Sequence, residues 1–298
     1  MVTFVEETVR VSVPATSANL GPGFDSLGLA LGLRDELSLT VRPGPVEVVV
    51  RGEGAGDVPL DESHLVLRSV AAALDLMGAE LPGVRLECRN VIPHSRGLGS
   101  SSAAIVAGVV LARAAVAGGA LLVSDDALFQ LAADIEGHPD NVAPAFFGGF
   151  TIAGREAGEW FSASSGVDPR ISTVVFIPPT PLRTEVARGL LPDAVPHADA
   201  AANAGRTALL VAALAGQPEL LLPATRDWLH QSQREPAMPD SVALVESLRA
   251  AGIPAVVSGA GPTVLAFAGA DPLGVAAHAP AGWRVEQLAV EPRGAFAH

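Results

Sequence analysis

The sequence contains one cysteine, Cys88, and no tyrosine among 298 residues. A single cysteine excludes an internal disulfide, and the absence of further cysteines argues against a structural zinc site. Cys88 lies in an alternating strand pattern, so we expect a small buried hydrophobic side chain there rather than a reactive thiol. The chain also lacks any run of about 18 apolar residues and any basic segment ahead of an apolar stretch at its amino end. We therefore expect a cytoplasmic protein with no membrane partner.

Basic residues are scarce, because 19 Lys and Arg face 32 Asp and Glu, a formal net charge of −13. An acidic surface repels phosphate backbones, so nucleic acid is not an expected partner. Charged residues make up only 17 % of the chain and apolar residues 49 %, which favours a well-packed interior over disorder. At this length two lobes are the natural expectation.

Carboxylates are missing altogether from residues 88–124, although the chain as a whole is acidic. The same stretch carries Arg89, Arg96 and Arg113. An acidic protein that admits a polyanion needs such a zone free of negative charge. The distribution of charge therefore predicts an anion-binding region here.

The stretch IPHSRGLGSSSAA, residues 92–104, fits that prediction. An alternating strand pattern over 84–88 precedes it, and a run without a polar face, which we expect to be a buried helix, follows from Ala103. A glycine-rich loop ahead of a helix lets free N–H groups and the helix dipole face an anion. The loop lacks a Walker A lysine. A simple turn with an N-cap stays open as the alternative.

Two further polar clusters stand in glycine- and proline-rich segments. PATSANLGPGFDSLGLAL, residues 14–31, would present Asn19 and Asp25 from a convoluted backbone, although such residues often cap turns. IEGHPDNVAPAFFGGF, residues 135–150, places four polar groups within six residues, next to two prolines that predict an irregular segment there. A hard cation held by a carboxylate, a serine hydroxyl and phosphate oxygens fits magnesium. The polar groups of this second cluster are Glu136, His138, Asp140 and Asn141.

The second half of the chain offers a buried strand over 171–177 and helices over 200–215, 219–231 and 239–251. Thr184 and Arg188 stand four residues apart and would share a helical face. Arg234 lies just after the second expected helix, where a lone arginine is usually a solvated surface residue. The string SGAGPT, residues 258–263, predicts a glycine turn between two strands.

Taken in order, these strings resemble the signatures of the GHMP kinases, and among them those of the homoserine kinases. The resemblance covers essentially the whole chain. It implies an α+β, two-lobed GHMP kinase fold, with a ribosomal protein S5 domain 2-like amino-terminal lobe and a ferredoxin-like carboxy-terminal lobe. We expect the lobes to span residues 1–160, with the phosphate-binding loop, and 161–298. The implied reaction is the ATP-dependent phosphorylation of the L-homoserine hydroxyl to O-phospho-L-homoserine, with Mg²⁺.

The resemblance also assigns roles to individual residues. Ser101 and Glu136 would hold the metal. The catalytic group would consist of Glu136, Asp140, Asn141 and Thr184. The substrate would be bound by Asn19, Asp25, His138, Arg188, Arg234 and Gly259. The triphosphate would lie along Pro93, His94, Ser95, Arg96, Gly97, Leu98, Gly99, Ser100, Ser101, Ser102 and Ala103. Ser232 and Gln233 replace the residues usual in the family just before the second arginine.

Several alternatives stay open at this point. Another GHMP small-molecule kinase, for mevalonate or a sugar, would carry similar loops, and so would a non-catalytic ATP-binding protein on the same fold. Asp140, Asn141 or neither could act on the hydroxyl proton, because positioning and charge neutralisation carry most of phosphoryl transfer. The oligomeric state also stays open, with a homodimer as the candidate.

Overall fold

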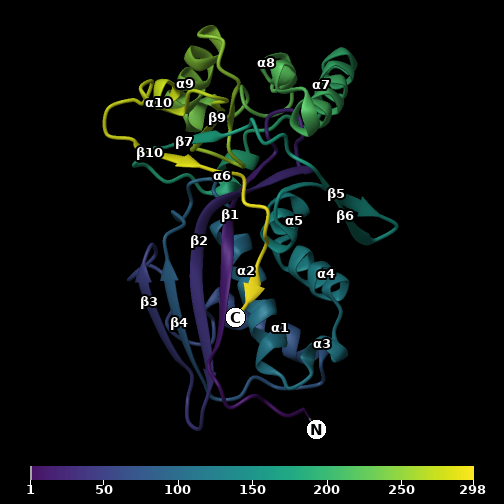
Figure 1. Cartoon of the computed structure of the whole chain (residues 1–298), viewed down its shortest axis with the longest axis vertical. Helices are drawn as coiled ribbons and strands as arrows, with labels where there is room; N and C mark the ends of the chain where they lie inside the picture. Colours follow the sequence, from purple (N-terminus) through teal and green to yellow (C-terminus); the bar gives the residue numbers. More distant parts are fainter. Residues whose placement is uncertain (1) are drawn as a thin grey trace.

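A computed structural model describes residues 2–298 as two lobes, one above the other in Figure 1. The lower lobe is built on a sheet whose strands run in the order β11-β1-β2-β4-β3, with β5 paired to β2 and β6 to β5. β1 and β2 are long and antiparallel, and they carry the first signature at the end nearest the upper lobe. The bounds are Val9–Ala18 for β1, Leu27–Val41 for β2, Glu47–Gly52 for β3, Val84–Asn90 for β4, Phe150–Glu156 for β5, Glu159–Ser165 for β6 and Phe296–Ala297 for β11.

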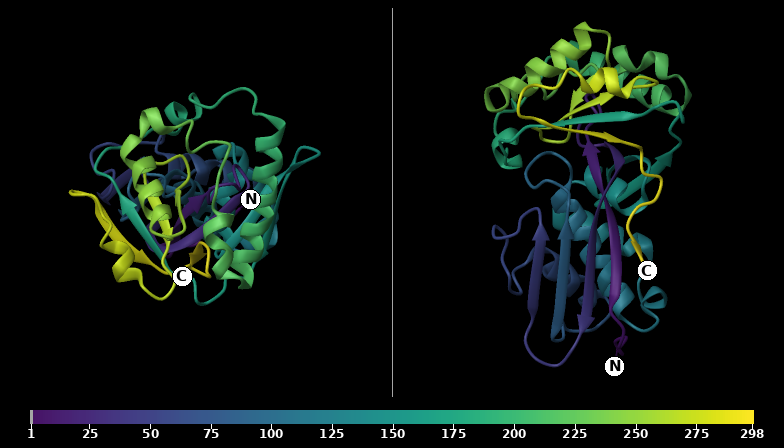
Figure 2. Two further views of the ribbon diagram at one scale, coloured as in Figure 1. Left: turned by 90° about the horizontal axis from the view of Figure 1, so that it is seen from above. Right: turned by 60° about the vertical axis from the view of Figure 1, so that its left-hand side comes forward.

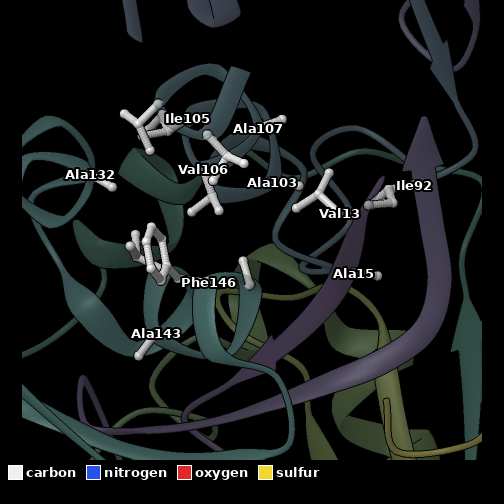
Figure 3. Close-up of a cluster of buried hydrophobic side chains, with 14 of the residues drawn as sticks. Val13, Ala15, Ile92, Ala103, Ile105, Val106, Ala107, Ala132, Ala143 and Phe146 are labelled. Atoms are coloured by element: carbon white, nitrogen blue, oxygen red, sulfur yellow. The ribbon is translucent and has the colours of Figure 1, made fainter. Parts of the chain in front are cut away.

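Helices cover one face of this sheet, as the right-hand view of Figure 2 shows. The central one is α2, Ser100–Ala115, which is apolar on almost every side and therefore packs into the core. Figure 3 shows how Ile105, Val106 and Ala107 of α2 lie among side chains from the sheet and the other helices. The remaining helices of the lobe are α1 (Leu65–Leu76), α3 (Gly119–Leu122), α4 (Asp125–Glu136) and α5 (Pro139–Phe147).

The upper lobe contains a four-stranded antiparallel sheet in the order β10-β7-β9-β8. Numbered along the chain this order is 4-1-3-2, the arrangement of a ferredoxin-like sheet, as expected. Its strands are β7 (Thr173–Ile177), β8 (Ala255–Val257), β9 (Val264–Phe267) and β10 (Arg284–Leu288). Its helices are α6 (Thr184–Arg188), α7 (His197–Gly216), α8 (Leu221–Ala224), α9 (Pro239–Ala250) and α10 (Pro272–Ala276), with short 3₁₀ turns at Pro218–Leu220 and Glu235–Ala237.

The end of the described chain returns to the first sheet. β11 pairs with β1 in antiparallel register, and Val290 forms an isolated bridge with Leu31. The Arg34 guanidinium donates to the carbonyls of Arg293 and Gly294 and stacks on Phe296. The division of the chain after residue 160 stays a prediction, and the sheets add that β6 extends the first sheet to Ser165.

Two local predictions are wrong. Residues 139–147 form helix α5 instead of an irregular segment, because Pro139 occupies its first turn, where no N–H is needed. Pro144 has no N–H to donate to the carbonyl of Asp140, four residues earlier. That carbonyl oxygen lies against Gly28. The helix expected over 219–231 stops at Ala224, because Asp227 accepts the N–H groups of the next residues and forms a turn. Within residues 2–298, no helix is both long and apolar enough to cross a membrane.

Candidate active site

The glycine-serine loop ends in the amino terminus of α2, as the sequence predicts. Gly97 and Gly99 have φ of 75° and 70°, a left-handed conformation that glycine adopts without strain. A Cβ on Gly99 would overlap the hydroxyl of Thr16, so the loop can approach β1 only without a side chain there. The first N–H groups of α2, from Ser100 onwards, have no carbonyl partner within the helix and face the loop. This geometry suits a phosphate.

Hydrogen bonds join the phosphate loop and the other signature segments, which lie far apart in the sequence. Thr16 donates to Oδ1 of Asn141 at 2.7 Å. Ser258 donates to the carbonyl of Gly97 at 2.6 Å. Asn19 donates from Nδ2 to the carbonyl of Gly259 at 2.8 Å. Segments that the sequence analysis selected separately therefore meet at one place between the lobes.

Glu136 lies at the amino terminus of α2 and accepts hydrogen bonds from two serines. Its Oε2 is 2.8 Å from Oγ of Ser101, and its Oε1 is 2.7 Å from Oγ of Ser102. One carboxylate and a hydroxyl are the oxygen ligands that Mg²⁺ takes when substrate phosphates and water supply the rest. Within residues 2–298 no group of three or more His, Cys, Asp or Glu side chains could hold a metal by itself. The donor set therefore fits a metal that is shared with a phosphate.

His138 and Asp140 form a pair beside the loop, with Nδ1 and Oδ1 3.0 Å apart. Asp140 is buried, whereas the imidazole is partly exposed. Burial lowers the pKa of His138, but the hydrogen bond and charge of Asp140, together with the charge of Glu136, outweigh it, and the net shift is upward. The carboxylate thus orients the ring and favours its protonated form.

Asp25 and Arg188 bind each other near the same site. Nη2 lies 2.6 Å from Oδ1, and Nη1 lies 3.1 Å from Oδ2. This carboxylate raises the pKa of the Arg188 guanidinium. Arg234 is only 1 % exposed, and burial is the main cause that lowers its pKa to about 10. Arg234 is therefore no surface residue, and it stays charged at neutral pH.

A cavity of about 140 Å³ collects these groups. Thr184, predicted to be catalytic, lies on its wall from the first turn of α6. The full lining consists of Asn19, Ser95, Gly97, Gly99, Ser100, Ser101, Glu136, His138, Asp140, Asn141, Leu182, Thr184, Arg188, Arg234, Gly259 and Ala260. All the predicted catalytic and metal residues line it, and so do all the predicted substrate residues except Asp25, which reaches it through Arg188.

Some predicted loop residues do not face this cavity. Arg96 donates to the carbonyls of His94, Pro178 and Pro179, so its guanidinium fastens the loop to the upper lobe. Pro93 and Leu98 are buried, and from there they contribute backbone only. Direct contact of these three side chains with ATP therefore has no support in the geometry.

A second cavity, of about 270 Å³, adjoins the first at the loop and shares Ser95, Ser100 and Ser101 with it. Its walls are largely apolar, and His94 joins it from the loop. The polar side chains at its rim include Asp35, whose Oδ1 accepts the N–H groups of Val91 and Ile92 at 2.6 and 3.0 Å. The apolar part consists of Leu37, Val58, Pro59, Leu65, Val66, Cys88 and Ala104.

Sequence reasoning missed three side chains of this site. Thr16 stands in the first signature, yet nothing in that string indicates its bond to Asn141. Phe24 lies against both arginines, with its ring centre 5.6 Å from Cζ of Arg188 and 5.5 Å from Cζ of Arg234. His230 bonds to Arg234, and its position four residues earlier was the signal that could have revealed it.

The fold and this site together define a GHMP kinase. Residues 64–149 match the amino-terminal domain model of the GHMP kinases and residues 209–282 their carboxy-terminal model, and the chain belongs to that family. Within it, the chain belongs to the homoserine kinases. It is 55 % identical over 293 residues to the homoserine kinase of Streptomyces coelicolor, covering 98 % of this chain and 95 % of that relative. The homoserine kinase of Streptomyces avermitilis is 56 % identical over the same length, with 98 % and 96 % covered.

Solved structures agree with this assignment. The crystal structure of homoserine kinase from Cytophaga hutchinsonii superposes with a TM-score of 0.85 at 25 % identity and covers 99 % of each chain. The mevalonate kinase of L. major, solved with R-mevalonate, has a TM-score of 0.70 at 16 % identity and covers 99 % of this chain and all of that one. At so low an identity the second likeness shows the fold alone.

Proposed function

We propose that this protein transfers the γ-phosphoryl group of ATP to the side-chain hydroxyl of L-homoserine, giving O-phospho-L-homoserine. One observation carries the proposal. A loop built for phosphate, with Ser101 and Glu136 at a helix terminus, shares a small cavity with Arg188 and Arg234, and Arg188 holds the carboxylate of Asp25. Phosphate donor and amino-acid acceptor would therefore meet in one enclosed place.

The nucleotide would occupy both cavities. Its base fits the larger apolar cavity beside Asp35, and its triphosphate would follow the loop from Ser95 to Ser101, which both cavities share. The free N–H groups of α2 would face the phosphate oxygens. The carboxylate-free stretch 88–124 keeps repulsion low along this path.

Mg²⁺ would be held by Ser101 and Glu136 together with phosphate oxygens. When bound, it supplies neutralisation of the charge that develops on the transferred group. Glu136 keeps the hydroxyls of Ser101 and Ser102 oriented toward it, so this part of the site is already arranged before the ligands arrive.

The acceptor side suits a zwitterion. Asp25 would take the ammonium group, and the guanidinium groups of Arg188 and Arg234 would take the carboxylate. The bidentate Asp25–Arg188 pair neutralises both charges in the free protein. A ligand with one charge would separate that pair and leave one member without a partner, which is costly in a partly desolvated site.

No dedicated base is needed for this reaction. Asn141 cannot take a proton, and its Oδ1 already accepts the Thr16 hydroxyl. Asp140 is engaged with His138. Phosphoryl transfer depends chiefly on alignment and charge stabilisation, so we assign Asp140 to orientation of His138 and Asn141 to orientation of the acceptor.

The charge of the acceptor cavity disfavours the alternatives. A sugar would leave the buried Arg234 without an anion, and mevalonate would leave Asp25 without a cation. A non-catalytic ATP-binding protein would have no use for Glu136 bonded to two loop serines.

The deciding measurement is ADP release by the purified protein with ATP, Mg²⁺ and a panel of homoserine, threonine, serine, mevalonate and galactose. We expect homoserine to give the highest kcat/KM, with the phosphorylated product identified by mass spectrometry. Faster turnover of mevalonate or galactose would refute the substrate, and no turnover of any alcohol would refute the activity.

A further inference from the structure

Arg234 is a buried cation without an acidic partner among residues 2–298. Its Nε donates to the carbonyl of Ala187 at 3.3 Å, and its Nη1 donates to the carbonyl of Gly259 at 3.2 Å. The remaining bond of Nη1, at 3.0 Å, goes to Nδ1 of His230. Every one of these partners is neutral. The guanidinium is therefore held in place by neutral groups and forms no ion pair, and Asp25, Asp227 and Asp140 act on its charge only from further away.

The tautomer of His230 follows from its two partners. Its Nε2 lies 2.8 Å from the carbonyl oxygen of Gly21, which can only accept, so Nε2 carries the hydrogen. Nδ1 then offers a lone pair, and a guanidinium can only donate. The ring is 0 % exposed, and burial is the main cause that lowers the pKa of His230. Asp227 and Asp25 oppose that shift, and Arg234 adds to it.

Phe24 completes the support of the two arginines. Its ring lies 5.1 Å from the His230 ring, centre to centre, and its centre is within 5.6 Å of Cζ of both Arg188 and Arg234. The negative face of an aromatic ring is attractive to a cation. Two like charges can thus stand on one wall of a small cavity, although Arg188 contributes to the lowered pKa of Arg234.

We propose that His230 is a positioning residue for substrate recognition: its Nδ1 accepts from Nη1 of Arg234 and turns the guanidinium toward the substrate carboxylate. The inference rests on the proposed function, since it takes the substrate to be an amino acid. His230 itself stays out of contact with the substrate, because it is enclosed by Gly21, Arg234 and Phe24.

Two isosteric changes separate this role from a structural one. In His230→Asn the side-chain oxygen can stand where Nδ1 stands and still accept from Arg234, but the donor to Gly21 is lost. In His230→Gln the amide nitrogen can stand where Nε2 stands and still donate to Gly21, but the acceptor for Arg234 is lost. Ser232→Ala, on the same turn and bonded only to the side chain of Gln233, is the matched control.

We expect His230→Gln to raise KM for homoserine by about 10- to 100-fold, with KM for ATP and kcat within about twofold of wild type. His230→Asn should raise KM for homoserine by less than about threefold, and Ser232→Ala should leave it unchanged. If His230→Asn is damaged as much as or more than His230→Gln, the histidine acts through Gly21 as an anchor, and the proposal fails.

Nitrogen-15 NMR of the wild-type protein tests the same inference without any variant. The His230 ring should be neutral with hydrogen on Nε2 at about pH 7, and homoserine should shift its Nδ1 signal. A protonated ring or the Nδ1–H tautomer would overturn the proposal. If wild type does not phosphorylate homoserine, the proposed function fails, while the tautomer still tests the His230–Arg234 bond.

Discussion

Asp25 and Arg188 stand 163 residues apart in the chain and meet in a bidentate ion pair, with oxygen–nitrogen distances of 2.6 and 3.1 Å. Asp25 belongs to the loop between β1 and β2, and Arg188 closes α6 of the other lobe. Both side chains are about one-third exposed. The pair therefore joins the two lobes at the mouth of the site and is accessible to a ligand that offers both charges.

Arg188→Ala should raise KM for homoserine by about 30- to 700-fold, the range expected when one partner of a desolvated charge pair is removed. KM for ATP should change little, because the cavity proposed for the base contains neither Asp25 nor Arg188 and the triphosphate would follow the loop from Ser95 to Ser101. Steady-state kinetics with each substrate varied in turn measure both constants. Arg183→Ala, which removes a neighbouring arginine bonded only to Glu185, is the control. Comparable effects of the two variants would remove Arg188 from the site.

Comparison with 3-amino-1-propanol, which lacks the carboxylate, sharpens that test. Wild type should use this analogue poorly, and Arg188→Ala should lose less with it than with homoserine. If the loss from the mutation and the loss from the analogue are simply additive in free energy, Arg188 does not contact the carboxylate.

Glu136→Gln should lower kcat by about 100-fold or more, since a charged ligand is lost where negative charge must be neutralised. The amide can still accept from one loop serine, so the melting temperature should stay close to that of wild type. Turnover is measured over a magnesium titration. Asp126→Asn, on the exposed first turn of the same helix, should be silent. Wild-type kcat in the Gln variant at saturating magnesium would exclude Glu136 as a ligand.

Asp140→Asn should reduce stability more at low pH than at high pH. Asp140 holds the pKa of His138 above its usual value of 6.5, so this pair stabilises the folded state fully below about pH 6.5 and loses that effect as pH rises through the folded pKa. Denaturant unfolding at pH 5.5 and pH 8 measures the difference. The kcat profile decides the other role: an acidic limb that disappears in the Asn variant, with stability retained, would make Asp140 the base.

Asp35→Asn should stabilise the protein increasingly as pH rises from about 4 to 6. Burial raises the pKa of Asp35 from 3.8 to about 6. Its ionisation therefore leaves the free energy of unfolding unchanged below about pH 4 and lowers it by about 3 kcal/mol above about pH 6. The amide oxygen keeps the bonds from Val91 and Ile92. Unfolding free energies of both proteins across this range provide the test, with Asp75→Asn, on the exposed side of α1, as the control. If the difference between the two unfolding free energies does not vary with pH, the pKa of Asp35 is not raised in the folded protein.

Local chemistry explains why the phosphate loop could be predicted from the sequence. The local conformation here depends on only a few neighbouring residues. Gly97 and Gly99 allow the left-handed backbone of the loop, and the apolar run predicts a buried helix α2. The predicted division after residue 160 falls within hairpin β5–β6, whose glycines and serines resemble a linker in the sequence, whereas its pairing with β2 depends on residues far away in the chain. The expected helix over 219–231 failed for a similar reason, since the turn at Asp227 is a side-chain effect that periodicity does not reveal.

Contacts between residues that are distant in the sequence could not be predicted from the sequence. Asp25 and Arg188 were each expected to contact substrate, but no pattern in either segment indicates that they bind each other. The burial of Arg234 is likewise a property of the assembled site, because His230, Gly259 and Ala187 come from three separate segments.

The return of β11 to the first sheet has a consequence for biosynthesis. β1 is translated long before its partner β11, so its outer edge stays bare until residues 296 and 297 emerge. The hydrogen bonds from Arg34 to the carbonyls of Arg293 and Gly294 also form only after those two residues have been made. The lobe that carries the phosphate loop therefore stays incomplete until the whole upper lobe has been translated. A nascent chain stalled before residue 290 should leave that edge open to proteases and to chaperones that bind bare strands.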